Sequence, residues 1–262
     1  MPKILVDGDG ILYRCGFAGE KTKYLVEYGE DFVRHDSFKE TREYPDTCTV
    51  WSRKQLDPIE NVLHSARTVI EKLVQRYKGR ELEIWLSPSV GNFREQIAKT
   101  AKYKGNRDQQ QRPTYYKDIQ KYLVEYWDAK YTEGQEADDA LGIGATNNSG
   151  SVIVSHDKDL LQIPGLHYNW TTEEEISVSA KEGSLNFYSQ VISGDAVDNV
   201  PGIPGLGPVR SRKMLGAAGS VRDCWQIVRD AYKDHGGDDR AIETARLVYV
   251  RRKEGEIWEP PT

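Results

Sequence analysis

Ile-Leu-Val-Asp-Gly-Asp-Gly, residues 4–10, is an apolar run that ends in carboxylates and glycines. The same arrangement returns at residues 152–159, where Val-Ile-Val-Ser is followed by His-Asp-Lys-Asp. A short, β-branched apolar run bounded in this way is typical of a buried strand in a parallel sheet. Because such sheets bind ligands at the carboxyl ends of their strands, we expect both acidic clusters at one edge of one sheet.

The rest of the chain alternates between strand-like and helix-like stretches. A helix is predicted from Pro58 to about Tyr77, because its apolar residues share one helical face. Further elements are expected as strands at 82–86, 166–169 and 176–178, a hairpin at 21–34, a helix at 135–145 and an irregular stretch at 36–57. This alternation predicts an α/β fold with a parallel-type central sheet flanked by helices. The pattern is helical from Ser184, so we expect an α/β body, 1–180, and a smaller helical lobe, 181–262.

Composition limits the classes of partner. The chain has 262 residues, of which 38% are hydrophobic, and its net charge of −5 argues against a generally basic nucleic-acid coat. A local basic groove remains compatible with that charge. No apolar stretch approaches the ~18 residues of a membrane span, so no membrane partner is expected. Cys15, Cys48 and Cys224 are far apart and show no zinc or disulfide spacing, which favours a reducing, cytoplasmic location.

Nine carboxylates stand in four short clusters with few cations between them. Two clusters follow the apolar runs above, the third is Glu-Ala-Asp-Asp at 136–139, and the fourth is Asp195 with Asp198. Two carboxylates ~4 Å apart repel by ~4 kcal/mol at an effective dielectric constant near ~20, so clusters that converge need bound cations. Oxygen-rich, sulfur-free sites suit Mg²⁺ or Mn²⁺. The clusters therefore predict a metal-dependent enzyme that acts on phosphate.

Each cluster also has a simpler interpretation. Asp-Gly is common in ordinary turns, acidic residues suit the first turn of any helix, and Asp157 with Asp159 could cap a short helix. Within the third cluster, Glu136 and Asp139 are three residues apart and can point together. Asp138 lies two residues after Glu136, so it points to a different side of the helix and can serve a different ion.

Residues 94–121 form a basic segment in an otherwise acidic chain. They contain eight Lys or Arg residues against three acids, with Tyr103, Tyr115 and Tyr116 interleaved. Cations and aromatic rings in one stretch fit a nucleic-acid single strand, with phosphates on the cations and bases on the rings. The alternative is a solvated charged surface.

A glycine-rich stretch at 202–207 precedes a basic helix. Gly-Ile-Pro-Gly-Leu-Gly is followed by Pro208 and then by Arg210, Arg212 and Lys213. Backbone N–H groups at such a helix start bind phosphate. The alternative is a flexible turn between lobes.

In chain order, these motifs resemble the 5′–3′ exonuclease and flap endonuclease family, especially its bacteriophage members. That family combines a PIN-like nuclease body with a helix-three-turn-helix DNA-binding lobe. The resemblance covers roughly residues 3–215 and rests on ILVDGDG (4–10), NFR (92–94) with YKGNR (103–107), EADD (136–139), SHDKD (155–159) and GDAVDNVPGIPGLG (194–207).

The resemblance implies a site for two divalent ions, Mg²⁺ or Mn²⁺, and a set of residues that act on DNA. Matching metal-site positions are Asp7, Glu136, Asp138, Asp139, Asp157, Asp159, Asp195 and Asp198. The catalytic residues are expected to be Arg94, Lys104 and Asp138. Nucleic acid is expected at Arg94, Tyr103, Lys104, Arg107, Gly205, Gly207, Arg210 and Lys213, with K⁺ at the 202–207 turn.

The implied activity is hydrolysis of DNA from or near a 5′ end, at a flap or nick, by a monomer in the cytoplasm, which would be the host cytoplasm for a phage protein. Two positions depart from the family pattern. Ser87 and Pro88 stand where an aspartate is usual, and Asp9 could compensate for its loss. Val209 follows Pro208 where a lysine is usual, and Arg210 could take over its phosphate contact.

Two other functions compete with this interpretation. A haloacid-dehalogenase-like phosphatase also has an apolar strand followed by Asp-x-Asp-Gly, but its late acids should follow a strand, whereas residues 185–192 have helical spacing. It also leaves 136–139, 155–159 and 94–121 unexplained. The second alternative is a structure-specific DNA-binding protein with an impaired metal site.

Overall fold

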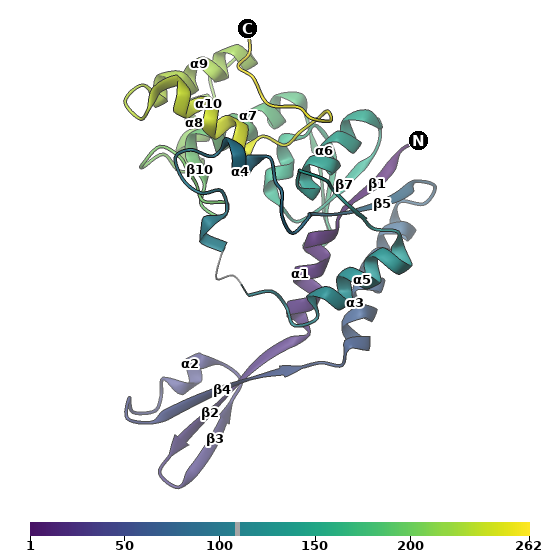
Figure 1. The fold of residues 1–262 in the computed structure, drawn as a ribbon, viewed down its shortest axis with the longest axis vertical. Coiled ribbons are helices and arrows are strands. Elements are labelled where there is room, and N and C mark those ends of the chain that lie inside the picture. Colours follow the sequence, from purple (N-terminus) through teal and green to yellow (C-terminus); the bar gives the residue numbers. More distant parts are fainter. Residues whose placement is uncertain (108–110) are drawn as a thin grey trace. The chain divides into compact units, whose positions relative to one another are not determined.

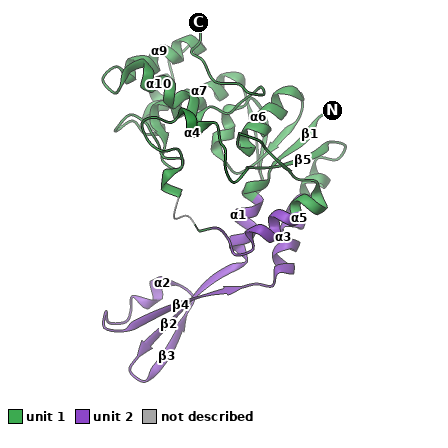
Figure 2. Cartoon of the chain, viewed as in Figure 1, with its two compact units in different colours: residues 1–10, 72–111, 123–262 green, residues 11–71, 112–122 purple. Residues whose placement is uncertain are grey.

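The computed structural model describes residues 1–107 and 111–262. Residues 108–110, which include Asp108 of the predicted basic segment, lie outside the described residues. The chain forms two compact units (Figure 2): unit 1 comprises residues 1–10, 72–111 and 123–262, and unit 2 comprises residues 11–71 and 112–122. Within the described chain, no helix has both the length and the apolar character needed to cross a membrane.

Unit 1 is built on a six-stranded sheet (Figure 1). Its order is β6-β5-β1-β7-β8-β9, with bounds Lys130–Tyr131, Glu81–Leu86, Lys3–Asp7, Val152–Val154, Gly165–Asn169 and Glu174–Val178. Every neighbouring pair is parallel except β8 with β9. The predicted α/β fold with a mostly parallel central sheet is therefore confirmed. The apolar runs of β1 and β7 are its buried centre, with Ile4, Leu5 and Val6 fully buried.

The first strand passes directly into a helix, α1 (Gly8–Ala18). A Cβ atom at Gly8 would lie 2.7 Å from the carbonyl oxygen of Trp85 on β5, so only glycine fits this close approach. The simpler interpretation of these residues was an ordinary Asp-Gly turn, but in the structure they begin a helix. As a result, Asp7 ends the strand and Asp9 lies in the first helical turn.

Helices complete unit 1 and supply its second core. The predicted helix at 135–145 is α6 (Ala137–Asn147), which packs against β1, β5 and β7. The other elements of this part of the chain are α4 (Arg94–Ile97), η1 (Gly105–Arg107), η2 (Lys158–Gln162), α7 (Ala180–Ser193), β10 (Gly194–Asp195), β11 (Val200–Pro201), α8 (Pro208–Leu215), α9 (Val221–Tyr232) and α10 (Gly237–Val248). Tyr188, Trp225 and Trp258 belong to a large buried cluster among these helices. Residues 181–262 lie in unit 1 together with the sheet, so a separate lobe from 181 stays a prediction.

Three helices run across the division of the chain into units. These are α1, α3 (Ile59–Arg76) and α5 (Tyr116–Trp127). The helix predicted between Pro58 and Tyr77 is thus confirmed as α3.

Unit 2 contains a three-stranded antiparallel sheet of order β3-β2-β4. The predicted hairpin is β2 (Glu20–Tyr28) with β3 (Asp31–His35). The prediction that 36–57 is irregular was wrong, because it contains α2 (Phe38–Thr41) and β4 (Thr49–Leu56). Every residue of β4 is exposed, so its sequence lacks the apolar alternation that marks a half-buried strand. Its pairing with β2 supplies the order that the hydrophobic pattern does not.

Candidate metal and nucleic-acid site

Two acids are joined across the centre of the sheet by a serine. Asp7 ends β1 and is 6% exposed, and Ser155 follows β7. The Ser155 hydroxyl donates to Asp7 Oδ2 at 2.8 Å and accepts the backbone N–H of Asp157 at 2.9 Å. Asp157 in turn caps η2 by accepting from the N–H of Asp159. Asp157 therefore caps a short helix, as the simpler interpretation proposed, and it also lies beside Asp7.

A second serine links α1, β5 and α6. The backbone N–H of Ser87, just after β5, donates to both carboxylate oxygens of Asp9, at 3.3 and 3.1 Å. The Ser87 hydroxyl accepts the N–H of Ala137 at 2.9 Å. Ser87 stands where an aspartate was expected, and the structure brings the Asp9 carboxylate to its backbone.

The three acids at the start of α6 differ in their hydrogen bonds. Glu136 and Asp139 form a reciprocal capping box, in which each side chain accepts the backbone N–H of the other residue. Asp138 lies between them and points elsewhere. Among the described residues, its carboxylate has neither a hydrogen-bond nor an ion-pair partner. Asp138 is thus the acid of this cluster whose oxygens are available to a ligand.

Arg94 holds Asp139 in a buried, bidentate ion pair. Its two terminal nitrogens donate to the carboxylate oxygens at 2.6 and 2.9 Å, and the side chains of both residues are 3% or less exposed. Arg94 also donates to the carbonyls of Leu247 and Tyr249, and the N–H of Arg251 donates to Asp139. Arg94 and Asp139 were expected at phosphate and metal respectively. In the structure their bonds join α4, α6 and the end of α10, and the two expected roles stay predictions.

Three residues of the basic segment reach Glu136 and Asp198. The Tyr103 hydroxyl donates to Asp198 at 2.7 Å and to Glu136 at 3.0 Å. Lys104 forms ion pairs with both acids, and Arg107 forms one with Asp198. Lys104 adopts a positive φ of 54°, and its N–H donates to the Asp198 carbonyl, so its backbone is fixed locally. Tyr103 is 6% exposed, so its ring is packed in the protein core and not presented to a base.

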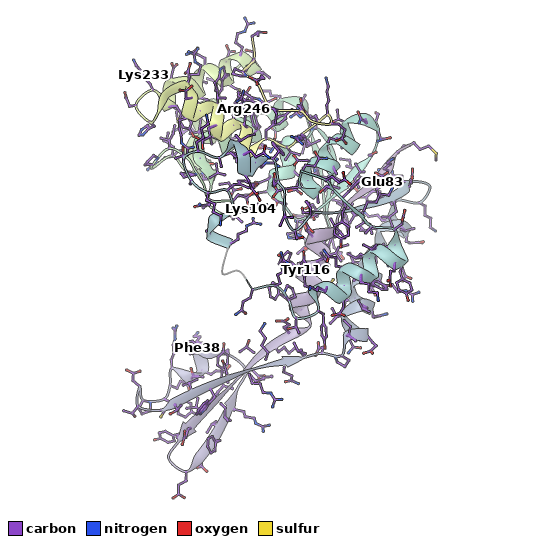
Figure 3. All side chains as sticks on the ribbon, viewed as in Figure 1. Phe38, Glu83, Lys104, Tyr116, Lys233 and Arg246 are labelled. Carbon is purple, nitrogen blue, oxygen red and sulfur yellow. The ribbon has the colours of Figure 1, made fainter. Side chains whose placement is uncertain are left out.

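Asp195 lies beside Asp159 at the same site. Its carboxylate accepts the N–H groups of Val197 and Asp198, and the amide of Gln190 donates to it at 3.3 Å. The close approach of the chain here needs glycine, because a Cβ at Gly194 would lie 2.2 Å from the backbone nitrogen of Gly202, the residue after β11. Acids from three of the four sequence clusters therefore face one cleft, and Asp7 and Asp157 lie close enough to Asp138 to raise its pKa. The cleft is lined by Arg94, Tyr103, Glu136, Asp138, Asp159, Gln190, Asp195, Asp198, Val200, Leu247, Val248 and Val250. Figure 3 labels Lys104, which pairs with Glu136 and Asp198 of this lining.

The acids without a cation hold their protons abnormally tightly. Burial, with Asp7 nearby, raises the pKa of Asp9 to about 7. Burial, with the charges of Asp157 and Asp195, raises the pKa of Asp159 to about 8. Burial and the neighbouring Asp7 and Asp157 also raise the pKa of Asp138 well above its usual value. Excess negative charge is thus concentrated on this side of the cleft.

The acids near the cations behave differently. Burial alone would raise the pKa of Glu136, but Lys104 and Arg94 outweigh it and hold this pKa below its usual value. Burial raises the pKa of Asp198, while Lys104 and Arg107 act in the opposite direction. The basic segment therefore outweighs burial at Glu136 and offsets it only in part at Asp198, while the acids opposite form no ion pair with any described residue.

The donor chemistry of the cleft fits a hard divalent cation. Its ligand candidates are carboxylate oxygens, the type that Mg²⁺ and Mn²⁺ prefer, and burial with neighbouring carboxylates raises the pKa of Asp138 and Asp159 among them. Across residues 1–107 and 111–262, no three Asp, Glu, His or Cys side chains are gathered closely enough to hold an ion as they stand. Metal binding would therefore require side-chain movement.

The glycine-rich turn presents an open backbone. A Cβ at Gly205 or Gly207 would meet no atom within 4 Å, and Gly207 is the N-cap of α8. Arg210 donates to the carbonyl of Gly205 at 2.9 Å, whereas Lys213 is exposed. These glycines and cations do not line the described carboxylate cleft. The predicted nucleic-acid residues thus fall into two groups, one at the cleft and one at the turn.

Sequence reasoning missed the residues that connect the acids. Ser87 and Ser155 both follow a central strand directly, and that position was a usable signal for each. Gln190 carries no such signal, because it reaches Asp195 only through the turn from α7 into β10.

No protein-family profile matches the chain. The exodeoxyribonuclease of Enterobacteria phage T3 is 29% identical over 157 residues, which are 54% of this chain and 51% of that protein. Flap endonuclease Xni of Shewanella piezotolerans is 30% identical over 155 residues, 51% of this chain and 60% of that protein. The 5′-3′ exonuclease of Buchnera aphidicola is 27% identical over 243 residues, which are 87% of this chain and 74% of that protein. The chain therefore spans about half the length of the phage relative and somewhat more of the bacterial ones.

Solved structures of a bacteriophage T5 enzyme share the fold. The T5 flap endonuclease in a complex with DNA and metal ions has a TM-score of 0.63 at 18% identity, covering 95% of this chain and 89% of that one. The T5 5′-exonuclease with bound zinc has a TM-score of 0.59 at 19% identity, with the same coverage. At this identity the likeness shows the fold, an α/β body with a mostly parallel six-stranded sheet.

Proposed function

We propose that this chain, which is similar to 5′–3′ exonucleases and flap endonucleases, hydrolyses DNA phosphodiester bonds at or near a 5′ end with the help of divalent metal ions. The observation that carries this proposal is the uncompensated side of the cleft. Asp9, Asp138, Asp157 and Asp159 all have raised pKa values. Carboxylates kept together against their repulsion are explained by a cation that they share.

The residues that would hold two Mg²⁺ or Mn²⁺ ions are the acids of the cleft that remain free of arginine. We assign this role to Asp7, Asp138, Asp157, Asp159 and Asp195, with Asp9 in place of the aspartate that Ser87 replaces. Glu136 and Asp198 join them when Lys104 and Arg107 turn to the substrate. When bound, the ions would activate a water molecule and stabilise the leaving oxygen. The T5 structures of the same fold contain metal ions, which supports metal binding by this chain.

Lys104 and Arg107 are proposed to hold the reacting phosphate. Their charges lie at the cleft, and charge-assisted contacts to phosphate are stronger than neutral ones. Arg94, which sequence reasoning placed beside them, is proposed to position α6 through Asp139, because its donors are already used within the core.

The turn at 202–207 is proposed to hold duplex DNA without reading its bases. Its open N–H groups, Arg210 and Lys213 suit successive phosphates, and phosphate contacts position a nucleic acid without specifying sequence. A K⁺ ion at the turn carbonyls, a monomeric state and a cytoplasmic location, in the host if the chain is of phage origin, belong to the same proposal.

The structure disfavours the phosphatase alternative. Residues 185–192 lie within the helix α7, so Asp195 follows a helix and not the strand that a phosphatase of that class requires. A DNA-binding protein without activity remains the alternative that an experiment must exclude.

The test is a time course of cleavage on 5′-labelled flap, nicked, blunt and single-stranded DNA with Mg²⁺, with Mn²⁺ and with EDTA. We expect metal-dependent release of short 5′ products. Binding without cleavage under both metals would establish the binding protein. Equal turnover in EDTA would overturn the metal-dependent mechanism.

A further inference from the structure

The sheet of unit 2 has one covered face and one open face. Successive residues of a strand point to opposite sides. On the covered face, Val26 is fully buried, Tyr24 packs against Phe38 and Tyr28 against Tyr44, each with ring centroids 5.6 Å apart. Figure 1 shows the strands with α2, and Figure 3 labels Phe38. The open face carries the alternate residues, chiefly Lys21, Lys23, Phe32, Arg34, Trp51 and Arg53.

Two large aromatic side chains stand on the open face. Phe32 is 61% exposed and Trp51 is 56% exposed. Their strands, β3 and β4, lie on either side of β2, where Leu25 is paired with both Trp51 and Arg34. Single exposed apolar residues are ordinary on protein surfaces. Two aromatic rings on one side of one small sheet, flanked by cations, form a surface suited to a ligand.

The charge of this face is opposite to that of the chain. Within the three described strands it carries four cations and one acid, Glu27, while the whole chain has a net charge of −5. Asp36, which follows β3, pairs with Lys23. Arg34 and Arg53 form neither an ion pair nor a hydrogen bond with any described residue. Their charges are therefore available to a negatively charged partner.

We propose that the open face of the three-stranded sheet binds a stretch of single-stranded DNA. Exposed rings can stack on bases only where the bases are unpaired, and the unpaired cations match the phosphates between them. An acidic protein would pair with the cations but offers no bases to stack on the rings. A duplex has phosphates, but its base faces are already stacked. The choice of DNA over other polyanions rests on the proposed function. Unit 2 would then contribute a binding surface separate from the carboxylate cleft.

The first test compares two substitutions at one position. Binding of labelled oligothymidine, longer than the ~4–16 nucleotides that one such surface covers, is measured by fluorescence anisotropy in EDTA. We expect Trp51→Leu to weaken binding about tenfold, because one stacking contact is lost. Trp51→Phe keeps a ring and should bind within about threefold of wild type. Circular dichroism and the melting temperature establish that both variants are folded.

The second test compares neighbouring cations on opposite faces of β4. Arg53 points to the open face, whereas Lys54 points to the covered face and pairs with Glu20. Each phosphate contact to a single strand contributes ~0.7 to the slope of log affinity against log salt. We expect Arg53→Gln to reduce that slope by about this amount and Lys54→Gln to leave it unchanged. Equal effects of the two substitutions, or none, would overturn the proposal.

The outcomes separate this inference from the proposed function. If Trp51→Leu binds single strands as wild type does, while wild type cleaves DNA, the inference about the open face is overturned and the proposed function stands. If wild type binds through Trp51 but never cleaves, the proposed function is overturned and binding by the open face stands. A change of mass in sedimentation for Trp51→Leu, with unchanged DNA affinity, would identify the face as a contact between two copies of the chain and overturn the inference.

Discussion

The two sides of the carboxylate cleft differ in how their charge is neutralised. On the paired side, Glu136, Asp139 and Asp198 bond to cations from the basic segment and α4. On the acid-only side, Asp138 and Asp159 form no ion pair with any described residue, and burial with neighbouring carboxylates raises their pKa values. Burial also acts on Glu136, but there Lys104 and Arg94 outweigh it.

Carboxylates on the two sides therefore have different roles. A carboxylate with a buried arginine partner stabilises the fold, because removing either partner leaves a charge without compensation. A carboxylate without a partner destabilises the free protein and is available to an ion. Substitutions on the two sides should therefore have opposite effects on stability and activity.

The largest effect is expected from Asp138→Asn on the acid-only side. The substitution removes a proposed metal ligand, so cleavage should fall by more than the ~10–100-fold that loss of an outlying partner of a metal ligand costs. The melting temperature in EDTA should rise, since one repelling charge is gone. The exposed Asp46→Asn is the matched control and should change neither quantity. Retained cleavage by Asp138→Asn would remove this residue from the proposed site.

On the paired side, Arg94→Gln should reduce the free energy of unfolding by ~3–5 kcal/mol, because Asp139 is left buried without its partner. Urea denaturation measures this change. The control is Arg67→Gln, which breaks an exposed pair with Glu71 worth ~0.3–0.5 kcal/mol. A cost for Arg94 no larger than that of the control would show that the buried pair does not hold α6.

Lys104 lies on the paired side, where it pairs with Glu136 and Asp198, and its loss should affect activity more than stability. A hydrogen bond to a charged group contributes ~1.5–3 kcal/mol, so Lys104→Met should slow cleavage about tenfold or more. Its side chain is 27% exposed, so its ion pairs are partly solvated and the melting temperature should fall less than it does for Arg94→Gln. Lys99→Met, an exposed cation of the same basic segment, should cleave normally. Equal rates for Lys104→Met and wild type at low substrate would refute its role at the phosphate.

The fourth expected effect is a dependence of stability on pH. The pKa of Asp9 rises from 3.8 to about 7, and that of Asp159 rises from 3.8 to about 8. The folded protein thus binds more protons than the unfolded chain between these values. In EDTA, the free energy of unfolding should fall as pH rises from ~4 to ~8, and Asp159→Asn should flatten the dependence. A stability that is constant or increasing over this range would contradict the uncompensated charge.

The sequence predicted the acid-only side better than the paired side. Asp7 and Asp157 could be placed because apolar runs fix the ends of buried strands, and parallel strands end at one edge. The capping role of Asp139 was readable from its spacing to Glu136. Its bond to Arg94 was not, because it joins residues 45 positions apart and depends on carbonyls at 247 and 249.

The sheet of unit 2 shows where periodicity fails. The hairpin at 21–34 has Val26 as a buried centre, so alternation is visible in its sequence. The strand β4 pairs with β2 but buries none of its own side chains, so it has no apolar pattern to read. Pairing between distant segments is a tertiary property, and the sequence of either strand alone does not contain it.

The central claim, that the acid-only side is the metal-binding side, is tested most directly by calorimetric titration of the free protein with Mn²⁺. Wild type, Asp138→Asn and Arg94→Lys would be measured at neutral pH in two buffers of different ionisation enthalpy. We predict that wild type binds Mn²⁺ with release of protons from Asp9 and Asp159, that Asp138→Asn binds much more weakly, and that Arg94→Lys, if folded, retains binding. Unchanged affinity in Asp138→Asn, with no proton release in wild type, would contradict the account.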